Sequence, residues 1–383
     1  MEKGLYVHIP FCRGRCHYCN FVSEGEPSPE FRKRFLDALV LEAEATFRRF
    51  GKLSFATFYL GGGTPSILTG EEITFLMKTV RDRFRFAADA EITAEWNPGD
   101  GDEERLRIFR DLGVNRISLG AQSFRDVLLN RLGRRHSVRD ILETLRKIRA
   151  TGISNISLDL MLRIPGQTPD DFRHSLDQCV ALEASQVSLY DLEVHEGTVL
   201  GDLKRDGSLD LPGEEDHARM YEAAIRTLTQ AGYEHYEISN FAMPGAASRH
   251  NLLYWHNREY LGLGPGAFSY LGGIRYQFAT DTGHYLAKCE ARDWTRDQED
   301  ALSEEDKEVE TFVTGLRLRK GVRPGDFKKI YPKVAERVAT LCGEGLMEFV
   351  GEDLRLTRRG KFLSEDVFGF LLKKDISSED SFL

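Results

Sequence analysis

Three cysteines near the N-terminus have the spacing of an iron–sulfur or metal site. Cys12, Cys16 and Cys19 form a C-x3-C-x2-C pattern, and the next cysteine along the chain is Cys179. A cubane [4Fe–4S] cluster is normally held by four cysteine thiolates. Three cysteines would therefore leave one iron open to another ligand, and an open iron is a binding or reaction site.

Structural zinc and three unrelated thiols are the alternatives to a cluster. Structural zinc usually has four protein ligands, arranged as two pairs. Here zinc would have to recruit His8, His17 or a distant residue. The spacing, with the aromatic Tyr18 just before the last cysteine, favours a [4Fe–4S] cluster held by the three cysteines.

Length, charge and hydropathy restrict the class of protein. The 383 residues allow one large and one small domain, and the net charge of -9 argues against a nucleic-acid partner. No apolar run approaches the length of a membrane span, and no signal peptide is visible. We therefore expect a cytoplasmic protein that is not integral to a membrane. Cys179, Cys289 and Cys342 are scattered singly, which predicts buried apolar residues rather than disulfides.

Strands and helices alternate through the first 240 residues. Strands are predicted at 5–10, 55–60, 90–96, 115–120, 156–162 and 186–192. Helix starts are predicted at Ser28, at the capping box of Thr69 and Glu72, and at Ser137 and Thr168. Alternation of this kind predicts an α/β fold with a parallel sheet and helices outside. Six units are too few for a closed eight-fold barrel, so we expect a partial (βα)6 barrel, with a doubly wound sheet as the alternative.

Polar and glycine-rich residues collect where these strands end. The cysteines follow the first strand and three glycines follow the second, and the later strands carry Glu95, Gln122, Asp159, Tyr190 and Glu193. In both architectures, ligands bind at the carboxyl ends of the strands. Each residue alone could be a turn glycine or a capping carboxylate. Their shared edge predicts one site.

The C-terminal part has a different pattern. Residues 293–306 are strongly charged and are expected to be a linker. Helices are predicted at 308–319 and 334–343, strands at 345–350 and 354–357, and a last helix from Arg359. Helices followed by a two-stranded wing predict a small winged-helix-like α+β domain. Because no basic recognition face is visible, packing or partner contact is expected rather than DNA binding.

Several motifs together resemble one family. YVHIPFC, GGGTP, the aligned carboxylates, HNLLYW and GLMEF...LRLTRRG are similar to those of the radical SAM proteins that include oxygen-independent coproporphyrinogen III oxidases and HemW-type heme chaperones. The resemblance covers nearly the whole chain. It implies a [4Fe–4S] cluster, S-adenosylmethionine and three parts: a radical SAM partial barrel at 1–240, a heme-motif segment and linker at 241–300, and a HemN-type winged-helix-like domain at 301–383.

The same resemblance implies contacts to S-adenosylmethionine. It places aromatic residues in the cofactor pocket and backbone at the methionine amino group, where glycine allows a ligand to approach closely. It adds polar contacts to the methionine and adenosine parts, which carry an ammonium, a carboxylate and a ribose. The residues so implied are Tyr6, Tyr18, Gly62, Gly63, Thr64, Glu95, Gln122, Arg134 and Asp159.

Three features separate the two branches of this family. The oxidases carry a further cysteine where this chain has Phe21, and they have a long arm before the cluster, whereas 11 residues precede Cys12 here. The segment HNLLYW resembles the heme-binding motif of the chaperones, which implies that His250 binds heme. The alternative for His250 is a hydrogen-bonded core histidine in an aromatic-rich turn. Phe268 stands where many relatives have histidine, which leaves His250 more isolated.

We therefore expect a heme carrier that passes heme to acceptor proteins, respiratory proteins among the candidates. The alternative is the oxidase, which removes two propionate carboxyl groups from coproporphyrinogen III. A winged-helix regulator that senses iron or redox state is a third candidate. The sequence does not decide whether the chain is an enzyme or whether it forms a homo-oligomer.

Overall fold

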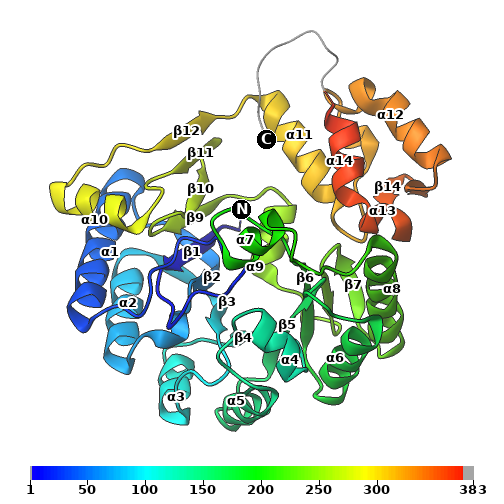
Figure 1. The fold of residues 1–383 in the computed structure, drawn as a ribbon. Coiled ribbons are helices and arrows are strands. Elements are labelled where there is room, and N and C mark those ends of the chain that lie inside the picture. Colours follow the sequence, from blue (N-terminus) through cyan, green and yellow to red (C-terminus); the bar gives the residue numbers. More distant parts are fainter. Residues whose placement is uncertain (1, 374–383) are drawn as a thin grey trace. The chain divides into compact units, whose positions relative to one another are not determined.

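Residues 2–373 are described by a computed structural model, shown as a ribbon in Figure 1. Contacts divide this part of the chain into two units. The first comprises the chain up to Glu234 together with Ser239–Leu253 and Arg258–Ala301, and the second comprises His235–Ile238, Tyr254–Asn257 and the chain from Leu302 onward. The three-part division expected at 1–240, 241–300 and 301–383 stays a prediction.

Six parallel strands form the centre of the first unit, in their order along the chain. They are β1 (Gly4–Ile9), β2 (Ser54–Gly62), β3 (Arg85–Trp96), β4 (Arg116–Gln122), β5 (Asn155–Leu162) and β6 (Gln186–Asp191). The helices between them are α1 (Pro29–Phe50), α2 (Gly70–Arg83), α3 (Glu103–Asp111), α4 (Asp126–Arg131), α5 (Val138–Ala150) and α6 (Pro169–Ala181). Figure 1 shows the helices outside the curved row of strands. The six predicted strand–helix units are confirmed.

Side-chain caps begin the helices where the sequence predicts them. Ser28 accepts a hydrogen bond from the N–H of Phe31 at the start of α1. Thr69, Ser137 and Thr168 each form a complete capping box, at α2, α5 and α6. Such a cap satisfies N–H groups that a helix cannot pair internally. These caps fix where each helix begins, and so the lengths of the loops at the strand ends.

The sheet continues beyond the six strands on both sides. Beside β1 lies the parallel strand β9 (Tyr260–Leu263), followed by the antiparallel strands β10 (Phe268–Leu271), β11 (Ile274–Gln277) and β12 (Gln298–Ala301). Strand β8 (Asn240–Ala242) pairs antiparallel with β6. The remaining elements of this unit are the short helix η1 (Pro65–Ile67), α7 (Val199–Arg205), α8 (Glu214–Gln230), α9 (Arg249–Trp255) and α10 (Thr282–Ala291).

The predicted linker at 293–306 is wrong. This stretch contains β12, whose four residues are all exposed, and the first turn of the next helix. The charged residues of β12 point to solvent while its backbone pairs with β11, as an edge strand allows. The prediction that all three scattered cysteines are buried is also corrected, because Cys179 and Cys289 are buried but Cys342 is partly exposed.

The second unit is a small α+β assembly. Its elements are β7 (Glu234–Glu237), α11 (Glu304–Leu316), η2 (Pro324–Asp326), α12 (Tyr331–Gly343), β13 (Met347–Val350), β14 (Asp353–Leu356), α13 (Arg358–Phe362) and α14 (Ser364–Leu372). Strands β13 and β14 form an antiparallel pair, and a core of buried residues including Phe312, Val338 and Leu354 holds the helices on it. The predicted helices and two-stranded wing are confirmed.

Candidate functional site

The cysteine loop follows β1 and is held mainly by backbone hydrogen bonds. The N–H of Cys12 donates to the carbonyl of Glu24, over 3.0 Å, and the N–H of His17 donates to the carbonyl of Leu132, over 2.9 Å. The guanidinium of Arg15 donates to the carbonyl of Cys19. All three loop cysteines are partly exposed and unpaired with one another. The loop is therefore anchored at both ends while its thiols stay accessible.

The three loop thiols are close enough to influence one another's pKa, but they do not form a single-metal site. Within residues 2–373, no group of three or more histidine, cysteine or acidic side chains could hold a single metal ion. A cubane cluster differs from a single ion, because each cysteine binds a different iron corner. Burial raises the pKa of the Cys12 thiol, while a hydrogen bond from Thr64 and the charge of Arg134 oppose that rise.

The triple glycine after β2 is required by packing. A Cβ atom on Gly62 would lie 2.6 Å from the ring of His8, and Gly62 has φ 109°, which disfavours any side chain. A Cβ atom on Gly63 would lie 2.6 Å from the carbonyl oxygen of Phe11. The absence of these side chains therefore lets β2 approach β1 and the start of the cysteine loop closely. Close approach of a cofactor to this backbone stays a prediction.

Two largely buried carboxyl groups lie on β3 and β5, with β4 between these strands. Glu95 accepts hydrogen bonds from the hydroxyl of Tyr59, over 2.9 Å, and from the N–H of Gly62, over 3.2 Å. Asp159 accepts from the hydroxyl of Ser118, over 3.1 Å. Burial raises the pKa of Glu95 to about 7 and that of Asp159 to about 6. A cation placed beside either carboxyl group would therefore lower its pKa and favour the ionised form.

Arg134 connects the cysteine loop to the end of β3. Its guanidinium donates to the side-chain oxygen of Asn97, over 3.0 Å, and bonds the hydroxyl of Tyr18. The amide of Asn97 in turn donates to Thr64, over 2.8 Å. Burial disfavours the charge on Arg134, but Tyr18 and the cysteine thiols raise its pKa overall. The Nε atom of Arg134 is buried and has no hydrogen-bond partner among the described residues.

Gln122 ends β4 in a conformation that few side-chain-bearing residues adopt. Its φ is 64°, in the left-handed region, and its side-chain oxygen is buried without a hydrogen-bond partner in the described chain. A Cβ atom on Gly120 would come within 3.3 Å of three polar groups: the amide nitrogen of Gln122, the guanidinium of Arg134 and the side-chain oxygen of Asn97. Strained backbone and unpaired polar atoms of this kind collect at ligand sites.

Tyr6 lies on β1 beneath this group. Its hydroxyl lies 3.0 Å from Nδ1 of His8, and its ring contacts that of Tyr59. Tyr190 and Glu193, at and after the end of β6, are exposed. The structure therefore brings together the cysteine loop and the predicted polar residues at the carboxyl ends of β1–β5.

The structure does not bring His250 to this group. His250 lies on α9 and its Nδ1 atom is 2.7 Å from the hydroxyl of Thr57, three residues after the start of β2. Its backbone N–H donates to Glu91, and its ring packs on Tyr59 at 5.1 Å between centroids. The residue is 2% exposed, and burial lowers its pKa to about 3. This is the geometry of the hydrogen-bonded core histidine that the sequence left as the alternative.

The sequence analysis missed Asn97 and the pocket beside it. A pocket of about 300 Å³ is lined by Cys16, Arg134 and the turn after β3, together with Arg13 and Arg135. Asp100 in this turn pairs with Arg13, over 3.2 Å, and accepts from Ser66, over 3.1 Å. Asn97-Pro98-Gly99 reads as an ordinary turn, but its position directly after Glu95 on a strand end could have indicated a role.

These residues fit the two groups that the resemblance implies. The loop supplies three accessible thiols. The Arg134 guanidinium lines the pocket beside the loop. The nearby strands carry the carboxyl groups of Glu95 and Asp159, and two buried polar atoms, Gln122 Oε1 and Arg134 Nε, have no hydrogen-bond partner in the described chain. S-adenosylmethionine carries the complementary ammonium, carboxylate and hydroxyl groups. None of the helices described between residues 2 and 373 has the length and apolar character that crossing a bilayer requires.

Comparison with known proteins gives a consistent result. Residues 6–179 match the Radical SAM superfamily. The chain is 37% identical to the heme chaperone HemW of Bacillus subtilis, over 97% of this chain and 99% of that protein, and 34% identical to HemW of Lactococcus lactis, over 98% of both. Its fold is similar to that of coproporphyrinogen III oxidase (HemN) from Escherichia coli, with a TM-score of 0.85 and 24% identity, over 97% of this chain and 90% of that one. The chain therefore belongs to the HemW heme chaperone family of radical SAM proteins.

Proposed function

We propose that this protein binds heme and passes it to acceptor proteins. The observation that carries the proposal is its likeness to heme chaperones along nearly the whole of both chains. A likeness confined to residues 6–179 would have supported only the shared radical SAM part. The likeness also includes the second unit, so the carrier function is proposed for the full chain.

The cofactors of this family are a [4Fe–4S] cluster and S-adenosylmethionine. We propose that Cys12, Cys16 and Cys19 hold the cluster, because they are accessible thiols on a loop anchored by its backbone. When bound, the pair supplies one-electron chemistry at the sulfonium group. This chain's residues hold and orient the cofactor and keep water away from it.

For S-adenosylmethionine we propose the residues gathered at the strand ends. Arg134 suits its carboxylate, while Glu95 and Asp159 suit its cationic groups, and each carboxyl group is held in place by hydroxyl donors. The unpaired oxygen of Gln122 is an acceptor for a ribose or amino group. The full set is Tyr6, Tyr18, Gly62, Gly63, Thr64, Glu95, Gln122, Arg134 and Asp159.

A heme-ligand role for His250 stays a prediction, and the geometry does not favour it. Iron ligation would require the ring to leave Thr57 and Tyr59 and to become exposed. Loss of this buried hydrogen bond alone would cost about 1–3 kcal/mol. Cytoplasmic location, respiratory acceptors and self-association are likewise proposals for this chain.

The oxidase is the second candidate because of the fold shared with coproporphyrinogen III oxidase. Likeness of fold at 24% identity does not identify the reaction. Phe21, which stands where the oxidases carry a further cysteine, is 63% exposed beside the cluster loop. The absence of that cysteine favours the heme carrier over the oxidase.

Heme transfer tests the proposal. Cluster-loaded protein is saturated with hemin, separated from free hemin, and mixed with a heme-free globin as a generic acceptor. We expect binding of hemin and its passage to the globin, followed by absorbance. Failure to bind hemin would contradict the proposal, and hemin that binds but never leaves would indicate storage rather than transfer.

A further inference from the structure

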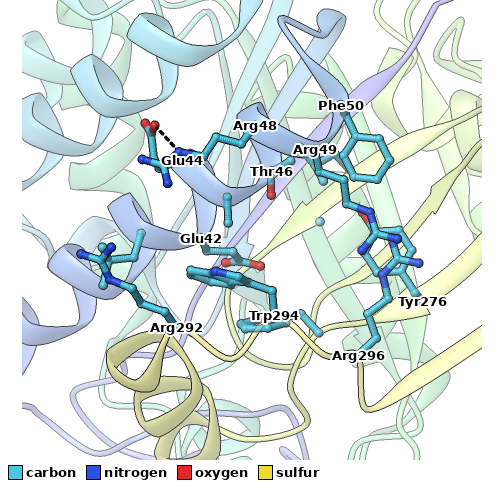
Figure 2. Close-up of a pocket in the computed structure, with 15 residues that line it drawn as sticks. Glu42, Glu44, Thr46, Arg48, Arg49, Phe50, Tyr276, Arg292, Trp294 and Arg296 are labelled. Atoms are coloured by element: carbon cyan, nitrogen blue, oxygen red, sulfur yellow. Dashed lines mark hydrogen bonds and ion pairs between the residues drawn. The ribbon is translucent and has the colours of Figure 1, made fainter.

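A second pocket shares no lining residue with the candidate site. It has a volume of about 470 Å³ and is formed by the C-terminal half of α1, by β9 and β11, and by the loop after α10. Figure 2 shows its labelled side chains. A volume of this size is within the usual range for organic ligands. Neither the proposed cluster nor the proposed S-adenosylmethionine contacts use it.

Aromatic rings form one wall of this pocket. The rings of Phe278 and Trp294 lie 5.7 Å apart between centroids and are tilted by 30°. Trp294 is only partly buried and stands at the centre of Figure 2, in front of Glu42. Because Trp294 presents an accessible ring in a pocket, the wall suits a flat apolar ligand, which could stack on it.

The mouth of the pocket is positively charged. Four arginines and two glutamates line it, and both glutamates are already engaged. Glu42 is buried and accepts from the N–H of Gly264 and the hydroxyl of Tyr285, while Glu44 pairs with Arg48.

Two of the four arginines remain available. Arg49 and Arg292 are exposed and form no ion pair within the described chain, and the Arg49 guanidinium lies 5.5 Å from the centre of the Phe50 ring, which leaves its hydrogen-bond donors unused. Figure 2 shows them on either side of Trp294. Two unpaired guanidinium groups beside an apolar wall complement a flat ligand that carries carboxylates.

No side chain in the pocket is suited to bind iron. The residues that line it include no histidine, cysteine or methionine. Tyr276 is 7% exposed, its hydroxyl is bonded by Ser269, and Arg296 covers its ring at 3.5 Å. Binding in this pocket would therefore depend on the organic ring and its acid groups, and not on a metal at its centre.

We propose that this pocket is a porphyrin-binding site, in which the ring lies on Trp294 and carboxylates meet Arg49 and Arg292. The inference rests on the proposed heme-carrier function and locates the cargo on the chain. A flat, apolar dicarboxylate is the class of ligand that the pocket fits, and the porphyrin of heme belongs to that class.

The test compares charge reversal at the mouth with a matched control. The first variant carries Arg49→Glu and Arg292→Glu. The control carries Arg146→Glu and Arg226→Glu, which change the net charge equally at two exposed helix positions away from the pocket. Cluster-loaded full-length proteins are titrated with metal-free protoporphyrin IX, with hemin and with protoporphyrin dimethyl ester, and absorbance gives each dissociation constant.

We expect wild type and control to bind protoporphyrin IX and hemin with comparable affinity. The mouth variant should bind both about tenfold more weakly, since two exposed ion pairs are lost. The ester should bind weakly to all three proteins. Equal affinity of mouth variant and control overturns the porphyrin site while the carrier function stands. Binding of hemin but not of protoporphyrin by wild type also overturns it, and binding of neither overturns both proposals.

Discussion

The two ends of the barrel strands differ in what their polar groups do. At the carboxyl ends, Gln122 has φ 64° and an unpaired oxygen, and Arg134 has an unpaired nitrogen. Near the amino ends, Thr57 lies 2.7 Å from His250, and Glu91 accepts the backbone N–H groups of Arg249 and His250 over 3.0 Å each. The first end holds polar atoms ready for a ligand, whereas these groups at the second end already satisfy one another.

This contrast shows why a motif alone does not locate a binding site. A histidine with neighbouring aromatic rings has the composition of a heme site. The same residue types also pack as buried core, as His250 does against Tyr59. Buried polar groups need partners, and at the amino end the protein supplies them itself. Burial and unpaired atoms separate the two cases where residue types do not.

The largest effect is expected for Cys16→Ala. Loss of one of three thiolates should abolish the cluster, because its iron would then have too few protein ligands. Iron and sulfide analysis after anaerobic reconstitution measures this, with Cys342→Ala in the second unit as the control. Four irons per chain in the Cys16 variant would contradict the ligand assignment.

Gly63→Ala should disturb the packing of the cysteine loop at the carboxyl ends of the strands. Its Cβ atom would lie 2.6 Å from the carbonyl oxygen of Phe11, in the residue before Cys12. We expect a loss of about 1–3 kcal/mol in the free energy of unfolding, together with lower cluster content. Gly25→Ala is the matched control, since no atom lies within 4 Å of its Cβ position. A stable variant with a full cluster would show that the close approach is unnecessary.

His250, near the amino ends of the strands, should contribute to the pH dependence of the free energy of unfolding. Burial lowers the pKa of His250 to about 3, so the folded ring stays neutral at pH values where the unfolded ring gains a proton. Stability should therefore fall as the pH falls below about 6.5, and His250 should contribute about 2 kcal/mol of that loss between pH 7 and pH 5.

Urea unfolding of wild type and His250→Gln at several pH values measures this contribution. Other histidines also titrate, so the difference between the two proteins is the informative quantity. Hemin affinity is measured on the same samples. An unchanged pH dependence, together with a large loss of hemin affinity, would instead indicate a ligand role for His250.

The smallest effect is expected for Arg134→Lys. Lysine keeps the charge but cannot hold Asn97 and Tyr18 together through one planar group. We expect about tenfold weaker binding of S-adenosylmethionine, or about 1.4 kcal/mol, by equilibrium dialysis. Arg139→Lys is the control. Unchanged affinity would place the cofactor carboxylate elsewhere.

Much of the fold could be predicted from local signals. The strand–helix alternation and the capping boxes at Thr69, Ser137 and Thr168 are encoded within a few residues, and the structure confirms them. Strands β9–β12 were not predicted, although they are no shorter than the predicted strands β13 and β14, which have four residues each. The last of them, β12, consists of exposed polar residues and alanine and depends on pairing with β11. Sequence pattern cannot reveal an edge strand that buries none of its side chains.

The candidate site could be predicted only in part for a related reason. Glu95, Gln122 and Asp159 end or lie on strands, so the parallel sheet brings them to one region. The place of His250 depends on Thr57, which is 193 residues away in sequence, and no local pattern encodes that contact. Asn97 was missed because Asn-Pro-Gly is typical of an ordinary turn.

The most direct test of the account uses anaerobic, cluster-loaded wild-type protein. One sample receives S-adenosylmethionine, a reductant and coproporphyrinogen III, and a parallel sample is titrated with hemin. The account predicts saturable hemin binding and no protoporphyrinogen. Turnover of coproporphyrinogen III to protoporphyrinogen would contradict it, and would show that neither Phe21 nor the likeness to heme chaperones decides the function.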